Sequence, residues 1–211
     1  MTTPGERPTS SALSFMGPLT VRDLATVPNL ITFVRLLMIP VFVWLLFGRD
    51  DRGGAAWLLA ALGSTDWVDG WFARRFAQVS EFGKLFDPLV DRLMFLVAIP
   101  CLLIDGSVPI VVAVLALARE GIVALAALVL AKAGVPRFDV TWEGKTGAFL
   151  LMFAFPLFLG SNSELSYADW LGPLAWLFAV PGLGYSYYSV LFQYLPMTRA
   201  GWLRAHSDTM R

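Results

Sequence analysis

The chain has 211 residues, of which 57% are apolar and only 15% are charged. A soluble domain carries about 25% charged residues, so this chain has too few polar side chains to coat a water-soluble globule of its size. The 16 basic and 16 acidic residues cancel, which argues against nucleic-acid binding, and a single cysteine excludes a scaffold of disulfides within the chain. A membrane protein of one domain remains.

Six apolar stretches approach or exceed the length of about 20 residues that crosses a bilayer as a helix. They are residues 30–47, 55–76, 85–104, 108–131, 145–159 and 170–194. Residues 21–28 are expected to form a short interfacial helix before the first of them. The sequence thus predicts an all-α, polytopic membrane protein with six transmembrane helices. Its domain would span residues 21–195, between polar tails at 1–20 and 196–211.

The basic residues indicate how the chain lies in the membrane. With six spans, both termini are on one side, which would hold eleven basic residues, whereas the other side would hold only Arg49 and Arg52. Cytoplasmic segments carry the excess of Lys and Arg. We therefore expect a multi-pass protein of the cell membrane with both termini in the cytoplasm, and the connection between the second and third spans faces the same side.

Four carboxylates interrupt the second and third predicted spans. Asp66 and Asp69 are three residues apart and share one helix face, and Asp87 and Asp91 are four apart on a face of the next helix. Carboxylates that face one another repel and could not all ionise, and divalent cations would remove that repulsion. All-oxygen ligation suits Mg²⁺ or Mn²⁺. The sequence predicts that these four residues bind metal.

Small and basic residues accompany the acids. Gly70 and Ala73 continue the face of the first pair, and Arg74 and Lys84 supply cations beside it. Bound metal, a bare helix face and basic side chains together indicate a site for a diphosphate. A helix with a solvated acidic face is the alternative interpretation, but the aromatic residues between the acids and the cost of charges within a span argue against it.

Residues 66–91 read D-x2-D-G-x2-A-R-x8-G-x3-D-x3-D. This pattern resembles the signature of the CDP-alcohol phosphatidyltransferases, with all eight defining positions filled at the expected spacings, and the resemblance extends from residue 28 to about residue 195. It implies a six-helix membrane enzyme, usually a homodimer. Such an enzyme transfers a phosphatidyl group from CDP-diacylglycerol to an alcohol and releases CMP.

The resemblance also implies roles for individual residues. Asp66, Asp69 and Asp87 would be ligands of two metal ions, Mg²⁺ or Mn²⁺, and Asp91 would be both a ligand and the general base. The residues that would bind CDP-diacylglycerol are Asn29, Thr32, Gly70, Ala73, Arg74 and Ser80. Asn29 has a simpler alternative role, because an Asn after a proline is also a good start for a helix.

The signature does not identify the acceptor alcohol. Arg119, Arg137 and Lys145 are candidates to bind an acceptor phosphate, although Arg119 and Glu120 could instead form an ion pair that fixes helix packing. Residues 140–159 most resemble the bacterial CMP-forming cardiolipin synthases, whose acceptor is phosphatidylglycerol. Phosphatidylglycerophosphate synthases, which use glycerol 3-phosphate, are the alternative branch, and inositol phosphate is a further possible acceptor.

A divalent-cation transporter is an alternative from another functional class. Against it, the four acids cluster at one end of two consecutive helices instead of following a path across the membrane, and the sequence shows no inverted repeat. Release of CMP would indicate the enzyme, and ion flux would indicate the transporter.

Overall fold

The structure is a computed structural model that describes residues 27–76, 83–132, 142–194 and 196. These residues form six α-helices and two short π-helical turns, and they contain no strand, so the all-α prediction is confirmed. The elements are α2 (Val27–Val43), η1 (Trp44–Gly48), α3 (Arg52–Phe76), α4 (Gly83–Asp105), α5 (Ile110–Lys132), α6 (Trp142–Ser161), α7 (Ala168–Ser189) and η2 (Val190–Tyr194). Each predicted span overlaps one of the six α-helices.

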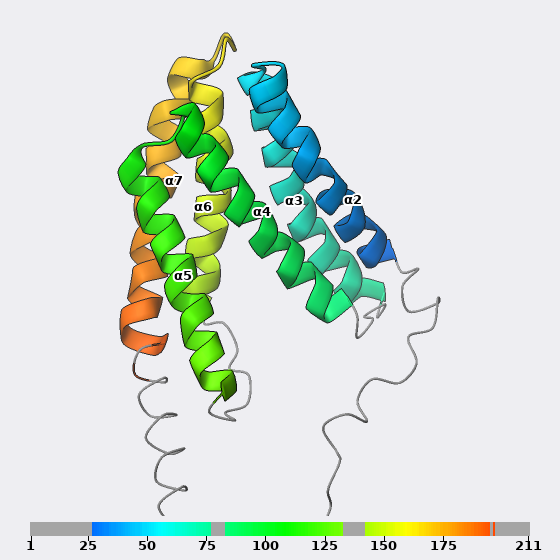
Figure 1. Cartoon of the computed structure of the whole chain (residues 1–211), viewed down its shortest axis with the longest axis vertical. Helices are drawn as coiled ribbons and strands as arrows, with labels where there is room; N and C mark the ends of the chain where they lie inside the picture. Colours follow the sequence, from blue (N-terminus) through cyan, green and yellow to red (C-terminus); the bar gives the residue numbers. More distant parts are fainter. Residues whose placement is uncertain (1–26, 77–82, 133–141, 195, 197–211) are drawn as a thin grey trace, which may run out of the picture.

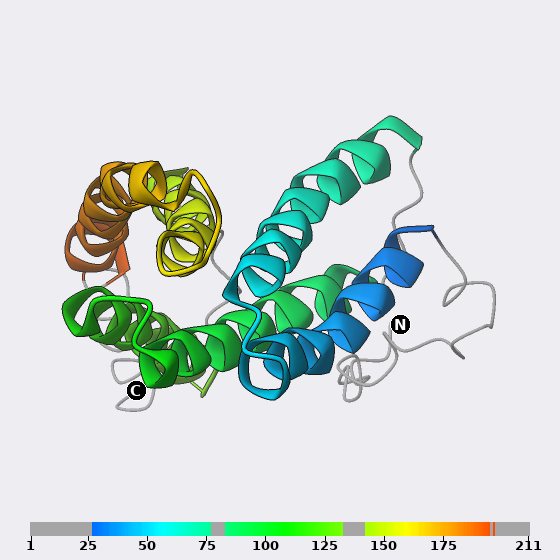
Figure 2. The same ribbon diagram turned by 90° about the horizontal axis from the view of Figure 1, so that it is seen from above.

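The helices converge at one end of the molecule and separate toward the other (Figure 1). α2 packs against α3 and α4, α6 packs against α3 and α7, and α4 runs obliquely from the first group of helices to α5 (Figure 2). The hydrophobic core lies at the converging end and includes Leu46, Ala55, Leu102, Leu159 and Ala175. The end of α3 and the start of α4, which carry the predicted signature, lie at the opposite end.

Short turns hold the converging end together. Asp51 caps α3, because its Oδ1 accepts a hydrogen bond of 2.7 Å from the backbone N–H of Gly54. Gly106 ends α4 with a φ of 77°, a conformation that a residue without Cβ adopts readily. The N–H groups of Gly106 and Ser107 donate back to carbonyl groups in the last turn of α4, each at 3.2 Å. These turns fix consecutive helices as antiparallel neighbours at this end.

Many large apolar side chains are exposed on the helices, among them Leu30, Trp57, Leu125 and Leu177. So many exposed large apolar side chains are unusual on a soluble monomer and suit contact with lipid. Within the described residues, three segments are long and apolar enough to cross a membrane: Asn29–Gly48, Ile110–Val129 and Trp142–Ser161. The count of six spans stays a prediction, as does the interfacial helix, since residues 21–26 lie outside the described residues.

Small residues allow α6 and α7 to pack closely. A Cβ added to Gly147 would lie 2.3 Å from Ser186 Oγ, 2.6 Å from the Ser186 backbone N and 2.8 Å from the carbonyl oxygen of Gly182. Contacts between small residues of this kind are a common way for membrane helices to associate. The backbone atoms cannot move aside without separating the two helices.

We therefore expect Gly147→Ala to destabilise the fold by about 1–3 kcal/mol, the usual cost of overpacking a well-packed interface. Gly184→Ala is the matched control, because a Cβ at Gly184 of α7 meets no described atom within 4 Å. Thermal unfolding in detergent measures both variants. Equal midpoints for the two would show that the α6–α7 contact does not depend on the glycine.

Candidate active site

α2 turns a polar face toward the interior of the molecule. Asn29, Thr32 and Arg35 are 5%, 1% and 1% exposed, whereas Leu30, Phe33 and Leu37 on the same helix are at least half exposed. Polar and charged groups within a membrane helix face the protein interior and mark functional sites. The polar face of α2 is therefore buried and its apolar face is exposed, the reverse of a surface helix in a soluble protein.

The buried guanidinium of Arg35 binds Asp91 on α4. Arg35 Nη1 donates to Asp91 Oδ1 at 2.5 Å, and the Asp91 side chain is 27% exposed. Charge-assisted hydrogen bonds are short and strong, so this pair fixes the position of the carboxylate. Asp91 also lines a pocket. The carboxylate is thus anchored by a buried cation and remains accessible from the pocket.

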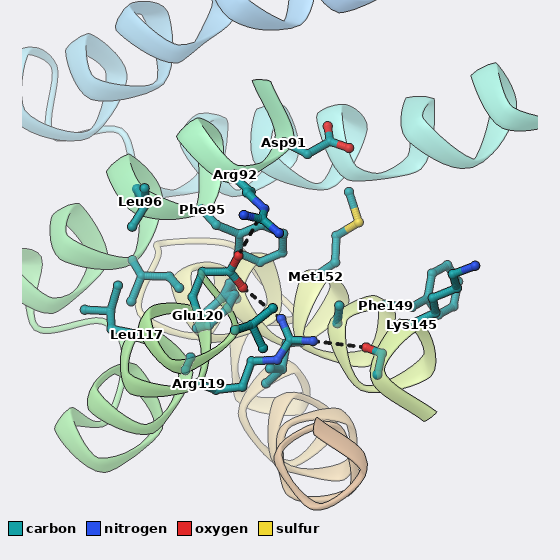
Figure 3. A pocket seen from close by; sticks show the side chains of 17 residues that line it. Asp91, Arg92, Phe95, Leu96, Leu117, Arg119, Glu120, Lys145, Phe149 and Met152 are labelled. Carbon is teal, nitrogen blue, oxygen red and sulfur yellow. Dashed lines mark hydrogen bonds and ion pairs between the residues drawn. The ribbon is translucent and has the colours of Figure 1, made fainter. Parts of the chain in front are cut away.

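This pocket has a volume of about 380 Å³ and lies between α4, α5 and α6 (Figure 3). Ligand pockets typically measure about 300–1,000 Å³. The charged residues of its lining are Asp91, Arg92, Arg119, Glu120 and Lys145. Three cations face two carboxylates, and one of these, Asp91, is already paired with Arg35, so the lining suits an anionic ligand.

Glu120 lies between two of these cations. Its Oε2 accepts a hydrogen bond of 2.8 Å from Arg119 Nη1, and its Oε1 is 3.6 Å from Arg92 Nε. Arg119 is buried, and its Nη2 donates to the carbonyl oxygen of Gly144 at 3.3 Å. The network joins α4, α5 and α6 across the pocket. Arg119 and Glu120 therefore form the ion pair that the sequence suggested, and this pair also lines the pocket.

The structure brings some of the predicted site residues together. Asp91, Arg119 and Lys145 line one pocket, and Lys145 lies exposed at its edge (Figure 3). Asn29 and Thr32 are buried on α2, one to two turns before Arg35. The pocket therefore joins the predicted general base to two of the three predicted acceptor-binding cations.

For the other predicted residues the structure describes less. Six of them lie in described helices, but the structure does not describe their surroundings: Asp66, Asp69, Gly70, Ala73, Arg74 and Asp87. Ser80 and Arg137 lie entirely outside the described residues. Among the side chains that are described, no cluster of three metal ligands occurs, and Asp91 is the one predicted ligand within that set. The metal site therefore stays a prediction.

Several residues of the site were not assigned a role from the sequence. Arg35 and Arg92 are conspicuous as charges within predicted spans, but their partners come from other helices. The apolar lining could have been inferred from helical spacing. Phe95 and Ile99 follow Asp91 by four and eight residues on α4, which places all three on one helix face.

Comparisons with known proteins agree with the signature. Residues 25–181 match the family described as CDP-alcohol phosphatidyltransferase. The chain is 36% identical over 159 residues to a protein of Streptomyces coelicolor named cardiolipin synthase (CMP-forming), an alignment that covers 73% of this chain and 74% of that one. It is 35% identical over 178 residues to a protein of Rickettsia felis named CDP-diacylglycerol–glycerol-3-phosphate 3-phosphatidyltransferase, which covers 79% of this chain and 96% of that one.

Three findings lead to the same conclusion. The family match covers most of the chain, the relatives align with about three quarters of it, and a pocket with charged residues lies among apolar helices. The chain is a transferase of phospholipid biosynthesis and belongs to the CDP-alcohol phosphatidyltransferase family.

Proposed function

We propose that the enzyme transfers the phosphatidyl group of CDP-diacylglycerol to phosphatidylglycerol, which yields cardiolipin and CMP. The observation that carries this choice is the pocket, in which Asp91 lies with three cations and most of the remaining lining is apolar. Phosphatidylglycerol offers both an anionic phosphodiester for these cations and acyl chains for the apolar lining, whereas glycerol 3-phosphate has no apolar group. The name of the Streptomyces relative supports the same activity.

In the proposed reaction, a hydroxyl oxygen of the acceptor attacks the phosphorus that is bonded to diacylglycerol. A new P–O bond forms to the acceptor, and the bond from that phosphorus to the oxygen of CMP breaks, so that CMP leaves with the electron pair. The Asp91 carboxylate takes the proton of the attacking hydroxyl as general base. Arg35 acts through Asp91, because it holds the carboxylate at the edge of the pocket.

On the donor side, the proposal keeps the residues that the signature implies for CDP-diacylglycerol: Asn29, Thr32, Gly70, Ala73, Arg74 and Ser80. Four carboxylates on two consecutive helices are a donor set that fits two hard divalent cations, Mg²⁺ or Mn²⁺. The residues that would hold them are Asp66, Asp69, Asp87 and Asp91. When bound, such cations neutralise the diphosphate and stabilise the charge on the departing CMP.

The proposal includes the arrangement in the membrane. The excess of basic residues on the side of the termini supports a multi-pass protein with both termini and the active site at the cytoplasmic face. The family resemblance supports a homodimer. Arg35 and Asp91 each lie eight residues after the first residue of their helix, and both helices, α2 and α4, begin at the separated end (Figure 1).

Phosphatidylglycerophosphate synthase is the second candidate, because the Rickettsia relative is aligned over almost its full length. The decisive experiment gives purified enzyme labelled CDP-diacylglycerol with phosphatidylglycerol or with glycerol 3-phosphate and identifies the lipid product. Cardiolipin from the first acceptor supports the proposal. Phosphatidylglycerophosphate from the second acceptor, with no cardiolipin from the first, would establish the second candidate instead.

Lys145 provides the cleaner test of acceptor binding, since it lies exposed at the edge of the pocket and its loss leaves no buried charge. We expect Lys145→Ala to raise the KM for phosphatidylglycerol about tenfold, the low end of the effect of losing a charge-assisted hydrogen bond once solvent screening is considered. The KM for CDP-diacylglycerol should change much less. Arg49→Ala, which removes an exposed cation at the converging end, is the matched control and should leave both constants unchanged.

A further inference from the structure

The lining of the pocket changes from charged to apolar along the helices. Beyond the charged residues it consists of Phe95, Ile99, Ala116, Leu117, Met152 and Phe155, among others. Ile99 lies eight residues after Asp91 on α4, and Phe155 lies ten residues after Lys145 on α6. At 1.5 Å per residue these separations are about 12 Å and 15 Å. Both helices run in this direction toward the converging end, so the apolar part lies deeper than the charged part.

The apolar part also reaches the lipid-facing surface. Leu96 of α4 lines the pocket and is 52% exposed. In Figure 3, Leu96 and Leu117 lie on one side of the Arg92–Glu120–Arg119 network, and Lys145 lies on the other. A molecule in this pocket can therefore contact charges at one end and the bilayer at the other.

We propose that the deep part of the pocket binds one acyl chain of the acceptor lipid. This inference rests on the proposed function and identifies the acceptor as a lipid through its chain. Suppose that the acceptor places its hydroxyl at Asp91 and its phosphate among the cations. The part of the acceptor on the far side of the phosphate then contacts the apolar lining. Glycerol 3-phosphate has no apolar group there, whereas phosphatidylglycerol has acyl chains. A pocket of about 380 Å³ is small among ligand sites, so it holds part of one chain, and the second chain stays in the bilayer.

The test uses a substitution that narrows the deep part of the pocket, and it measures how activity depends on the length of the acceptor's acyl chains. Ala116 of α5 is 4% exposed and lines the pocket, whereas Ala118 is exposed and outside the lining. We expect Ala116→Leu to lower kcat/KM for dioleoyl-phosphatidylglycerol about tenfold, the factor for losing the burial of roughly two methylene groups. The value for dihexanoyl-phosphatidylglycerol should change less than twofold. Ala118→Leu, the same change on the same helix, should alter neither value.

A second pair of variants tests the same site if Ala116→Leu does not fold. Leu96→Phe enlarges a half-exposed lining residue, and Leu93→Phe enlarges an exposed residue of the same helix outside the lining. Loss of preference for long-chain acceptor in Leu96→Phe alone supports the proposal. Equal behaviour of each variant and its control would overturn it, and so would a changed dependence on the chain length of CDP-diacylglycerol instead of the acceptor.

The failure of this inference is distinct from the failure of the proposed function. If wild-type enzyme makes cardiolipin but its variants show no change in chain-length dependence, the acceptor is phosphatidylglycerol and the acyl-chain site is wrong. If wild-type enzyme makes no cardiolipin from either chain length and converts glycerol 3-phosphate, the proposed function is wrong and the inference falls with it.

Discussion

Chelation with EDTA is expected to abolish CMP release by the purified enzyme, and added Mg²⁺ or Mn²⁺ is expected to restore it. The reason is electrostatic. Without cations, the carboxylates of Asp66, Asp69, Asp87 and Asp91 would repel one another and would also repel the diphosphate of the donor. CMP would then leave without a group that stabilises its charge. A radiochemical assay of CMP release in chelated buffer, with each metal added back, measures the effect.

Metal binding can also be measured without turnover. A cation that binds the folded state raises stability by about 2.7 kcal/mol at a hundred times its dissociation constant. We therefore expect Mg²⁺ or Mn²⁺ to raise the unfolding midpoint of the wild-type enzyme and to have a much smaller effect on Asp66→Asn. Asp50→Asn is the matched control, since Asp50 is an exposed acid at the converging end. Full activity in metal-free buffer, or an equal metal effect in all three proteins, would contradict the metal site.

The helices of this protein could be predicted well from the sequence, because length and hydropathy determine where a membrane segment forms a helix. The stretch expected at residues 85–104 is α4 (Gly83–Asp105), and that expected at 108–131 is α5 (Ile110–Lys132). The predicted and observed helices differ at their ends, because turns determine where a helix begins and ends. The Gly106 turn, for example, places the boundary between α4 and α5 through backbone hydrogen bonds that hydropathy does not report.

The pairing of side chains across the site could not be predicted in the same way. Arg35 and Asp91 are 56 residues apart, and nothing in the sequence says that α2 packs against α4 at this level. Helical periodicity predicts which residues share a face, but the neighbouring helix depends on how all the helices pack. The Glu120 network has the same origin, since it links residues from three helices. Sequence reasoning suggested the Arg119–Glu120 pair, but it did not predict that Arg92 of α4 and the Gly144 carbonyl group of α6 lie against this pair.

The chemistry of the signature was more accessible than its geometry. The carboxylates could be recognised from spacing alone, because ionisable groups within apolar helices are costly and therefore informative. The apolar depth of the pocket carried no such signal, since an additional Phe or Ile in a membrane helix is the expected residue. This asymmetry explains why the family was evident from the chain while the acceptor depends on the pocket.

Asp91→Asn is expected to lower kcat at least about 10²-fold, the lower range for loss of a general base. The amide keeps the size of the side chain and an oxygen that can accept the hydrogen bond from Arg35, so the fold should persist. It cannot accept the proton of the acceptor hydroxyl at neutral pH. Steady-state CMP release gives kcat, and binding of CDP-diacylglycerol, measured separately, should weaken much less than kcat falls.

Asp91→Ala separates the chemical role of the carboxylate from its structural role. This variant removes the Asp91 oxygen that accepts the hydrogen bond from the buried Arg35, and removing one partner of a buried ion pair is destabilising. We therefore expect Asp91→Ala to be inactive and to unfold at a clearly lower temperature. Asp91→Asn keeps an oxygen for Arg35 but loses the charge, so it should be nearly inactive with a smaller fall in the unfolding midpoint. Near-normal kcat in Asp91→Asn would assign the general base to another residue, whereas equal destabilisation of both variants would mean that Asp91 acts mainly by holding α2 against α4.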